Sequence, residues 1–159
     1  METDDAEFML TLLNEPSFVR NIGDRGVRTI ADAESYITAG PLASYERFGF
    51  GLYIVQLKRS GASIGICGLL KRETLRDVDI GFAFLPRFWS RGYAFESAAA
   101  VREHARNDVG LQRLVAIVDP VNAGSIRVLE KLGFTFERMI RLGDEQKDLK
   151  LFGCDLSRA

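Results

Sequence analysis

Cysteine, proline, tryptophan and histidine are scarce in this chain of 159 residues, which has two, four, one and one of them, respectively. Cys67 and Cys154 lie far apart, without Cys-x-x-Cys spacing or a histidine cluster, so they predict a reduced, cytoplasmic protein with no metal site. No apolar run approaches the length of a membrane span, and no signal-peptide pattern opens the chain. We therefore expect no membrane partner.

An excess of charge of either sign is also lacking. The formal net charge is −1, whereas a general nucleic-acid binder needs a basic face, so no nucleic-acid partner is expected. What is present is an ordinary globular composition, 47% hydrophobic and 27% charged. A chain of this length predicts a single domain, residues 1–159, that buries roughly 70% of the surface exposed by its unfolded form.

The chain is organised around a strand, a basic loop and a helix between residues 77 and 107. Apolar residues alternate with small or acidic ones from Val78 to Phe84, which is the period-2 pattern of a strand. Pro86 ends that strand, and an alanine-rich segment with helical spacing begins at Tyr93. The loop 87–92 therefore lies at a helix N-terminus, where unpaired N–H groups and the helix dipole favour an anion.

Four residues suit this loop to a phosphate. Arg87 and Arg91 add positive charge, while Gly92 and the small Ser90 let a diphosphate approach the backbone. The loop matches neither the nucleoside-triphosphate loop nor the dinucleotide-binding fingerprint, because the required glycine and lysine spacing is missing. On these residues alone, an ordinary turn between a strand and a helix remains an alternative.

The same patterns predict the other elements. We expect helices at 3–14, 29–40 and 122–133, strands at 50–58, 62–70, 113–118, 134–142 and 149–156, and a loop at 17–28. The run 113–118 is almost uninterruptedly apolar, which is typical of a strand buried on both faces. A strand–helix–strand crossover makes it a parallel neighbour of the strand before the basic loop, and ligands bind at the carboxyl ends of such strands.

Two motifs resemble signatures of the GNAT N-acyltransferase superfamily. The run Trp89-Ser90-Arg91-Gly92-Tyr93-Ala94-x-Glu96 is similar to its acyl-CoA loop, most of all in the branch that acetylates the N-termini of ribosomal proteins. The second motif lies one strand later and resembles the other GNAT signature. It is the run Asn122-x-x-Ser125-x-x-Val128-Leu129-Glu130-Lys131-Leu132-Gly133-Phe134. The resemblance covers residues 3–156 and is most specific at 77–134.

The resemblance implies an α+β GNAT fold: a mixed, mostly antiparallel, twisted sheet whose central parallel pair is splayed around the acyl-CoA site, with helices on both faces. It also implies acetyl-CoA as the co-substrate and direct attack of a neutral amine on the thioester. Backbone groups of residues 82–84 would pair with the pantetheine arm, and amides of residues 90–94 would hold the diphosphate. The implied cofactor-binding residues are Phe82, Ala83, Phe84, Arg87, Trp89, Ser90, Arg91, Gly92, Tyr93, Ala94, Asn122 and Ser125.

The sequence departs from the resembled family at three places. Ser90 stands where the loop usually has its first glycine, and Leu129 stands where many relatives carry a general-acid tyrosine. Ser125 is therefore the candidate for stabilising or protonating the leaving thiolate. The strand that usually precedes the first helix is also missing. Either the sheet lacks that edge strand or the start is shortened, and an open edge would favour a homodimer.

Asp79 and Glu96 are the carboxylates best placed to deprotonate the attacking amine, directly or through water. Glu96 equally fits a structural role, because an acid in a first helical turn is stabilised by the helix dipole. An α-amine, with a pKa near ~8, needs less help than a lysine side chain near ~10.4. For the single histidine, His104, a packing or surface role is expected.

The sequence leaves the acceptor open. The two motifs favour a peptide or protein N-terminal α-amine, and the alternative is a small amine such as a polyamine or an aminoglycoside. Leu129 and the undecided base favour a different class, a CoA-binding module without catalysis. A plain structural or interaction domain is the third alternative.

Overall fold

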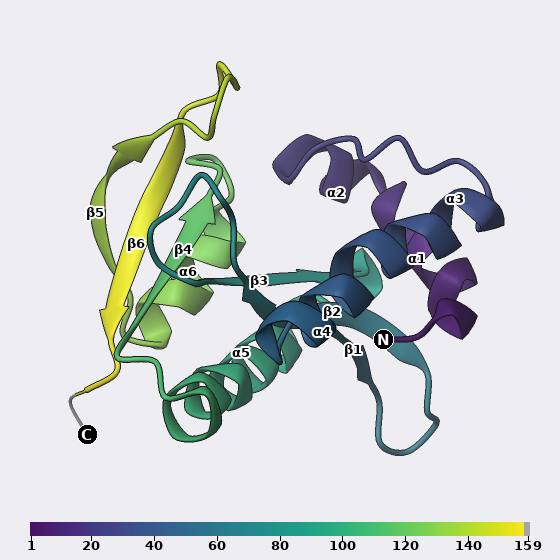
Figure 1. Ribbon diagram of the computed structural model, residues 1–159, viewed down its shortest axis with the longest axis horizontal. Coiled ribbons are helices and arrows are strands. Elements are labelled where there is room, and N and C mark those ends of the chain that lie inside the picture. Colours follow the sequence, from purple (N-terminus) through teal and green to yellow (C-terminus); the bar gives the residue numbers. More distant parts are fainter. Residues whose placement is uncertain (158–159) are drawn as a thin grey trace.

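The computed structural model describes residues 1–157, which form a six-stranded sheet with helices on both faces (Figure 1). The strands are β1 (Leu52–Gln56), β2 (Ser63–Leu70), β3 (Asp79–Phe84), β4 (Arg113–Val118), β5 (Thr135–Ile140) and β6 (Leu149–Asp155). The α-helices are α1 (Ala6–Leu13), α2 (Pro16–Asn21), α3 (Ile30–Ile37), α4 (Ala43–Phe48), α5 (Tyr93–His104) and α6 (Ala123–Lys131). Short 3-10 turns at Thr3–Asp5 and Pro86–Phe88 and π turns at Thr38–Leu42 and Ala105–Val109 complete the elements.

The sheet has the order β1-β2-β3-β4-β6-β5, and β3 with β4 is its parallel pair. These two strands meet at one point, where Asp79 pairs with Val115 and the Val115 N–H donates to the carbonyl of Val78 at 3.1 Å. All the other neighbouring strands are antiparallel. Beyond the pairing point, β3 and β4 point in different directions (Figure 1). The sheet therefore opens into a V at the carboxyl ends of β3 and β4, as the family resemblance implied.

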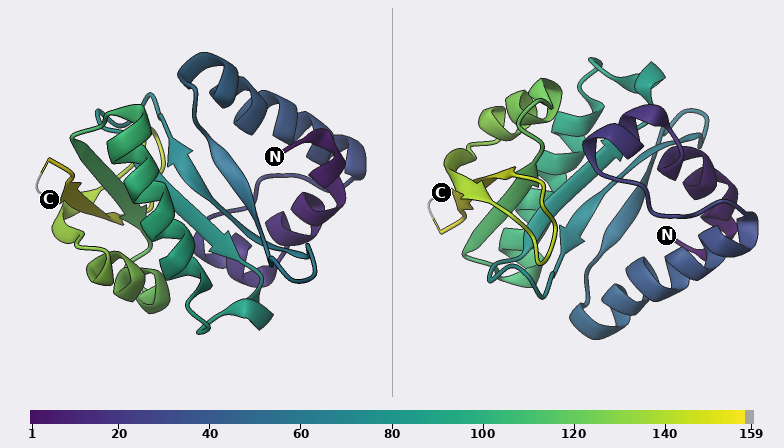
Figure 2. Two further views of the ribbon diagram at one scale, coloured as in Figure 1. Left: turned by 90° about the horizontal axis from the view of Figure 1, so that it is seen from below. Right: turned by 90° about the horizontal axis from the view of Figure 1, so that it is seen from above.

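Helices lie on both faces of the sheet (Figure 2), and an apolar core lies between the sheet and the helices on each face. On one face, Ala98 of α5 and Leu129 of α6 are buried together with Leu114 of β4. On the other face, Met9 of α1 is buried together with Ile66 of β2. Each fully buried side chain of this size stabilises the fold by about 1.5–3 kcal/mol. Thus α5 and α6 cover one face of the sheet, α5 on β2 and β3 and α6 on β4, whereas the N-terminal helices cover the other face of β1–β3.

Two expectations for the N-terminal region are wrong. The expected loop at 17–28 begins with α2, because Pro16 occupies the first helical turn, where its missing N–H costs nothing, and Phe18 is buried in the core. Gly40 and Pro41 do not end the helix that starts after Thr29. The chain continues through the π turn Thr38–Leu42 into α4, since the wider turn accommodates the proline ring.

The remaining elements are confirmed within one to a few residues at their ends. Thr29 caps α3 with Asp32 in a reciprocal capping box, and Asn122 caps α6. β1 is an edge strand, and residues 1–51 contribute no strand to the sheet. The homodimer that such an open edge would favour stays a prediction. Within residues 1–157, the structure has no helix of the length and apolar character needed to cross a bilayer.

Candidate active site

The loop after β3 turns through two left-handed residues before α5 begins. Ser90 has a φ of 59° and is the one non-glycine residue with a positive φ among residues 1–157. Gly92, the N-cap of α5, has a φ of 85°. A side chain in this region of backbone conformation costs roughly 1–2 kcal/mol, which gives a physical reason for a glycine at the position of Ser90. Strain of this kind is retained where the surrounding structure or a ligand requires it.

The space beside this loop fits a phosphate-bearing ligand. Apart from its chain neighbours and the adjoining backbone, a Cβ built on Gly92 would meet no atom of the described residues within 4 Å, so the approach to the backbone is open. Arg87 and Arg91 lie with their guanidinium carbons 4.9 and 5.9 Å from the centre of the Phe88 ring. Within the part of the chain that the structure describes, neither arginine has an acidic partner. Their charge therefore adds to the positive end of α5.

Trp89 fixes the loop to the end of β3. Its side chain is about half exposed, and its indole Nε1–H donates to the carbonyl of Phe84 at 2.9 Å. The carbonyl of Phe84 is one of the groups predicted to pair with the pantetheine arm. A carbonyl oxygen has two acceptor sites, so this bond leaves one of them for a ligand.

The second motif lies at the other arm of the V, directly after β4. Asn122 caps α6, since its side chain accepts a hydrogen bond from the backbone N–H of Ser125 at 3.3 Å. Ser125 is half-buried, and its hydroxyl has no hydrogen-bond partner within residues 1–157. The fold therefore brings the two motifs to the carboxyl ends of the two parallel strands, one at each arm (Figure 1).

Asp79 lies at the closed end of the V and is 1% exposed. Its carboxylate accepts two hydrogen bonds from Arg72 Nε, at 3.1 and 3.2 Å. Burial raises the pKa of Asp79 to about 6, although the positive charge of Arg72 acts in the opposite direction. A carboxyl group with this pKa can accept a proton near neutral pH. Arg72, its ion-pair partner, was missed by the sequence reasoning.

Glu96 and His104 lie elsewhere. Glu96 is exposed in the first turn of α5, and within the described chain its carboxylate has no hydrogen-bond partner. It lies at the opposite end of β3 from Asp79, so the fold does not bring the two candidate bases together. His104 ends α5, where its Nδ1 lies 2.8 Å from an oxygen of Asp108 and its ring packs edge-on against Tyr53. The packing role expected for His104 is confirmed.

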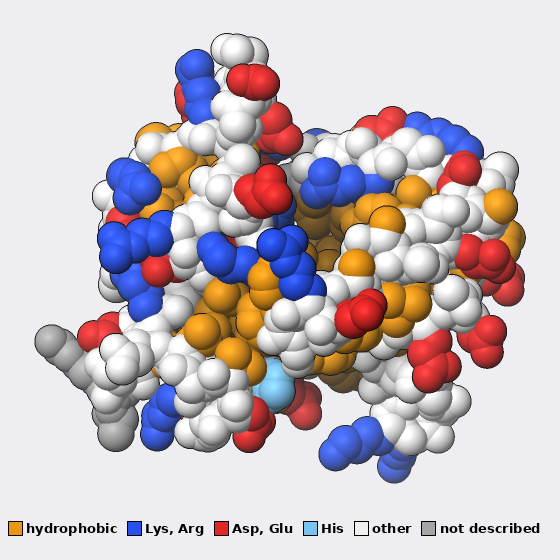
Figure 3. Space-filling model, in the orientation of Figure 1, with side chains coloured by type: hydrophobic (Ala, Val, Ile, Leu, Met, Phe, Trp, Pro, Cys, Tyr) orange, Lys and Arg blue, Asp and Glu red, His pale blue; other side chains and the backbone are white. Residues whose placement is uncertain are grey.

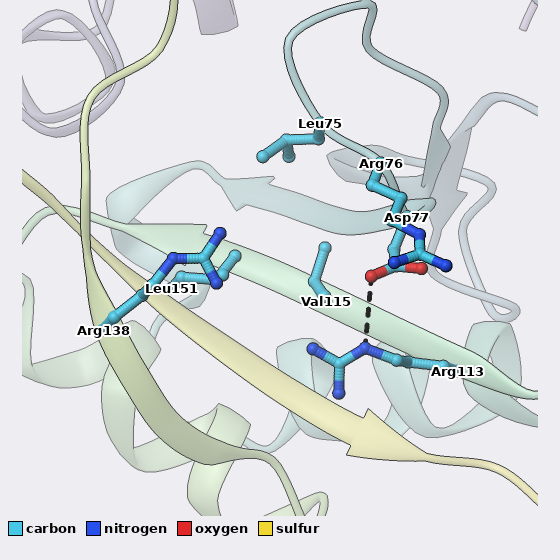
Figure 4. A pocket seen from close by; sticks show the side chains of 7 residues that line it. All are labelled: Leu75, Arg76, Asp77, Arg113, Val115, Arg138 and Leu151. Carbon is cyan, nitrogen blue, oxygen red and sulfur yellow. Dashed lines mark hydrogen bonds and ion pairs between the residues drawn. The ribbon is translucent and has the colours of Figure 1, made fainter.

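The face of β4 opposite α5 and α6 carries a pocket of about 300 Å³ that the sequence did not indicate (Figure 4). It is lined by Leu75, Arg76, Asp77, Arg113, Val115, Arg138 and Leu151. Val115 is the residue at which β3 and β4 meet, so the pocket begins at the closed end of the V. The basic run Lys71-Arg72 and Arg76 in the β2–β3 loop was the available signal.

One contact joins the two halves of the molecule across the V. The ammonium of Lys147, in the β5–β6 loop, lies 2.7 Å from the carboxylate of Asp119 and donates to the carbonyl of Arg20 in α2 at 3.5 Å. Asp119 directly follows β4. Figure 3 shows the surface hollowed between the two halves, with hydrophobic side chains at the bottom. The hollow and the V together leave room for an acceptor on this face.

Comparisons with known proteins agree with this geometry. The family described as "Acetyltransferase (GNAT) domain" matches residues 1–135. The YkkB protein of Bacillus subtilis (strain 168) is 36% identical over 96 residues, 59% of this chain and 56% of that protein, so the match spans about half of that relative's length. The N-acetyltransferase YnaD of the same organism is 30% identical over 127 residues, 77% of this chain and 72% of that protein.

Two solved structures with bound CoA share the fold. The ribosomal L7/L12 alpha-N-protein acetyltransferase RimL in complex with coenzyme A has a TM-score of 0.83 at 15% identity, covering 98% of this chain and 90% of its own. The spermidine N-acetyltransferase of Vibrio cholerae, in complex with CoA and spermine, has a TM-score of 0.81 at 15% identity, covering 99% and 94%. At such low identity these structures support the fold alone. The family match over most of the chain, together with YnaD, shows that this protein belongs to the GNAT family of acetyl-CoA-dependent N-acetyltransferases.

Proposed function

We propose that this protein transfers the acetyl group of acetyl-CoA to the α-amine of a peptide or protein N-terminus. The observation that carries the proposal is the V between β3 and β4, which has an anion-suited loop at one arm and the half-buried hydroxyl of Ser125 at the other. The reaction is direct attack in a ternary complex. The amine nitrogen forms a bond to the thioester carbon, the carbon–sulfur bond breaks, and CoA leaves as a thiolate.

The cofactor side uses the residues around the loop. Backbone N–H groups of Ser90, Gly92 and Ala94 bind the diphosphate, with charge from Arg87 and Arg91. The open space beside Gly92 supports this assignment. The pantetheine arm then runs back along β3 from Phe84 towards Phe82, as an added strand does. Its thioester end consequently lies within the V, between the open end and Asp79 at the closed end.

The general acid and the general base are assigned from the burial and the hydrogen-bond partners of the candidate side chains. Ser125 donates its hydroxyl proton to the thiolate, or a hydrogen bond that stabilises it, because no described side chain occupies that hydroxyl. Asp79 accepts the proton that the amine loses, through water, since its buried carboxyl group has a pKa of about 6. Glu96 is the second candidate for the base, but its exposure and its place at the other end of β3 favour a structural role.

The acceptor assignment rests on the two motifs and on the shared fold of a protein N-terminal acetyltransferase, RimL. The spermidine acetyltransferase has the same fold, and therefore a small polyamine is the alternative acceptor. A CoA-binding module without catalysis is a further alternative, favoured by Leu129, which is buried in the core and offers no acidic proton.

The experiment is a calorimetric titration with acetyl-CoA, followed by thiol-release assays with N-terminal peptides, spermidine and an aminoglycoside. We expect saturable one-site binding of acetyl-CoA and turnover with N-terminal peptides. Turnover with the small amines alone would overturn the peptide assignment. Binding of acetyl-CoA without thiol release on any amine would favour the non-catalytic module.

A further inference from the structure

The pocket above Val115 is positively charged. Arg113 is neutralised, because its Nε lies 3.2 Å from Asp77 Oδ2 and its Nη2 lies 2.7 Å from Glu137 Oε2. Arg76 and Arg138 also line the pocket, and within residues 1–157 neither has an acidic partner in an ion pair. Figure 4 shows Arg138 and Arg76 on different sides of Val115. Three guanidinium groups against the carboxylates of Asp77 and Glu137 leave a net charge of +1. Arg76 and Arg138, which have no ion-pair partner among the described residues, suit a carboxylate or phosphate above the apolar floor.

Basic side chains also lie on the wider surface around the pocket, interspersed with acidic ones (Figure 3). Figure 3 shows Lys and Arg side chains gathered on this face over β5, β6 and the β2–β3 loop. Lys71 holds that loop in place by donating to the carbonyls of Leu75 and Arg76, both at 2.9 Å. The loop that carries Arg76 is therefore fixed beside the pocket rather than extended into solvent.

The pocket lies within reach of the reacting centre. Side chains alternate along a strand, so Val115 and Ile117 of β4 face the same side, and Ile117 pairs with Leu151, which lines the pocket. Two residues along a strand span about 7 Å. Ile117 is half-buried and lies beyond the point where β3 and β4 separate. An acceptor whose amine enters the V beside Ile117 can thus place a group about two residues away over Val115.

The charge of the pocket is not explained by the cofactor. The loop assigned to the diphosphate, Ser90 to Ala94, follows the carboxyl end of β3, whereas the pocket lies beside Asp79 at the beginning of that strand. The pocket therefore lies at the end of β3 away from the proposed diphosphate loop.

We propose that this pocket binds an anionic group, a carboxylate or a phosphate, that the acceptor carries about 7 Å from its attacking amine. This inference rests on the proposed function, because it takes the V as the place of the amine. It narrows the acceptor to acidic amines, for example a peptide with an acidic second or third residue. A polyamine is disfavoured, since its extra ammonium groups would meet Arg76 and Arg138.

The test uses matched peptides with the CoA-bound protein. One peptide carries Glu at its third position, a second carries Gln there, and a third carries phosphoserine; calorimetry measures affinity and thiol release measures turnover. We expect the Glu and phosphoserine peptides to bind roughly tenfold more tightly than the Gln peptide, a ratio typical of one charge-assisted hydrogen bond. Inorganic phosphate alone is titrated as well, to separate a site for free anions from one for the acceptor.

The variants Arg138→Gln and Arg76→Gln should each remove most of that preference while leaving the affinity for acetyl-CoA unchanged. Arg127→Gln is the control, because this exposed arginine on α6 undergoes the same change of charge and does not line the pocket. Equal affinities of the Glu and Gln peptides, or an equal loss in the Arg127 variant, would overturn the proposal. So would arginine-dependent binding of inorganic phosphate without a peptide preference.

Failure of the proposed function is recognisable separately. It is indicated by the absence of thiol release with every peptide, whereas the preference for acidic peptides is read from calorimetry alone. A protein that acetylates the Glu and Gln peptides with equal kcat/KM and affinity keeps the proposed function and loses the anionic subsite.

Discussion

The guanidinium of Arg72 holds the buried carboxylate of Asp79, with its Nε 3.1 Å from one oxygen and 3.2 Å from the other. This pair closes the end of the V at which β3 and β4 meet. Burial disfavours the charged carboxylate, and it raises the pKa of Asp79 from 3.8 to about 6 in spite of the nearby arginine. A buried carboxylate with a strongly shifted pKa that lies beside the proposed reacting centre is a candidate for function.

Replacement of Asp79 by Asn should change how stability depends on pH. The folded state holds the Asp79 proton to a higher pH than the unfolded chain, so this group's contribution to the free energy of unfolding is largest below pH 4. The contribution falls by about 2–3 kcal/mol as the pH rises from about 4 to about 6, and it is constant above that range. Urea unfolding of the wild type and of Asp79→Asn between pH 3.5 and 7 measures this difference. If the free energies of unfolding of the two proteins change in parallel with pH, the prediction is contradicted.

Arg72→Gln should shift the pH profile of acetyl transfer. If Asp79 is the base, kcat/KM of the wild type falls on the acid side with an apparent pKa near 6. Arg72 lowers the pKa of Asp79, so its removal should move this acid limb to higher pH. Arg72→Lys keeps the charge and should keep the limb close to its wild-type position. An acid limb that stays in place in Arg72→Gln would mean that another group titrates.

Gly92→Val should weaken acetyl-CoA binding at least tenfold, because the branched side chain fills the open space beside the α5 N-terminus. The φ of 85° also adds backbone strain of roughly 1–2 kcal/mol, and this strain lowers stability. Gly49→Val is a matched control, since Gly49 has a φ of 78°, open surroundings and a place at the end of α4. Comparable losses of acetyl-CoA affinity in both variants, measured by calorimetry, would show that strain alone is responsible.

Ser125→Ala should lower kcat by roughly ten- to a hundredfold and leave the affinity for acetyl-CoA within about twofold, because a thiolate partner acts mainly in the transition state. Asn122→Ala provides the contrast. Loss of its cap on α6 should cost about 1 kcal/mol of stability, visible in thermal unfolding. Steady-state kinetics and calorimetry on the same preparations distinguish the effects of Ser125→Ala and Asn122→Ala. Equal losses of turnover and of acetyl-CoA affinity in Ser125→Ala would make Ser125 a binding residue.

Ser90→Gly should retain acetyl-CoA binding and raise stability by up to about 1 kcal/mol, because glycine adopts the φ of 59° without a Cβ penalty. Part of the gain is offset by the greater entropy of glycine in the unfolded chain. Thermal unfolding measures the difference. A marked loss of stability would mean that the Ser90 side chain makes a contribution that outweighs the strain.

The sequence by itself determined the framework of the site. The alternation from Val78 to Phe84, the turn at Gly92 and the cap at Asn122 are local features, and each has one favoured backbone conformation. The crossover rule then made two strands parallel without any knowledge of contacts. Hence the parallel pair, the loop and the second motif could be predicted in their places, whereas the splaying of the pair into a V was implied only by the family resemblance. In the structure the loop and the second motif lie at the carboxyl ends of β3 and β4.

Only the tertiary structure decided the features that depend on contacts between distant segments. The segment after Pro16 was expected to be a loop and the helix before Pro41 was expected to end there. Burial of Phe18 and of Pro41 itself instead favours α2 and the continuation into α4. Likewise, no pattern in the sequence pairs Arg72 with Asp79 or brings Arg76 and Arg138 around Val115. Burial and charge pairing depend on which chain segments the sheet places side by side. The register of the strands is set by packing of the whole core rather than by residues adjacent in the sequence.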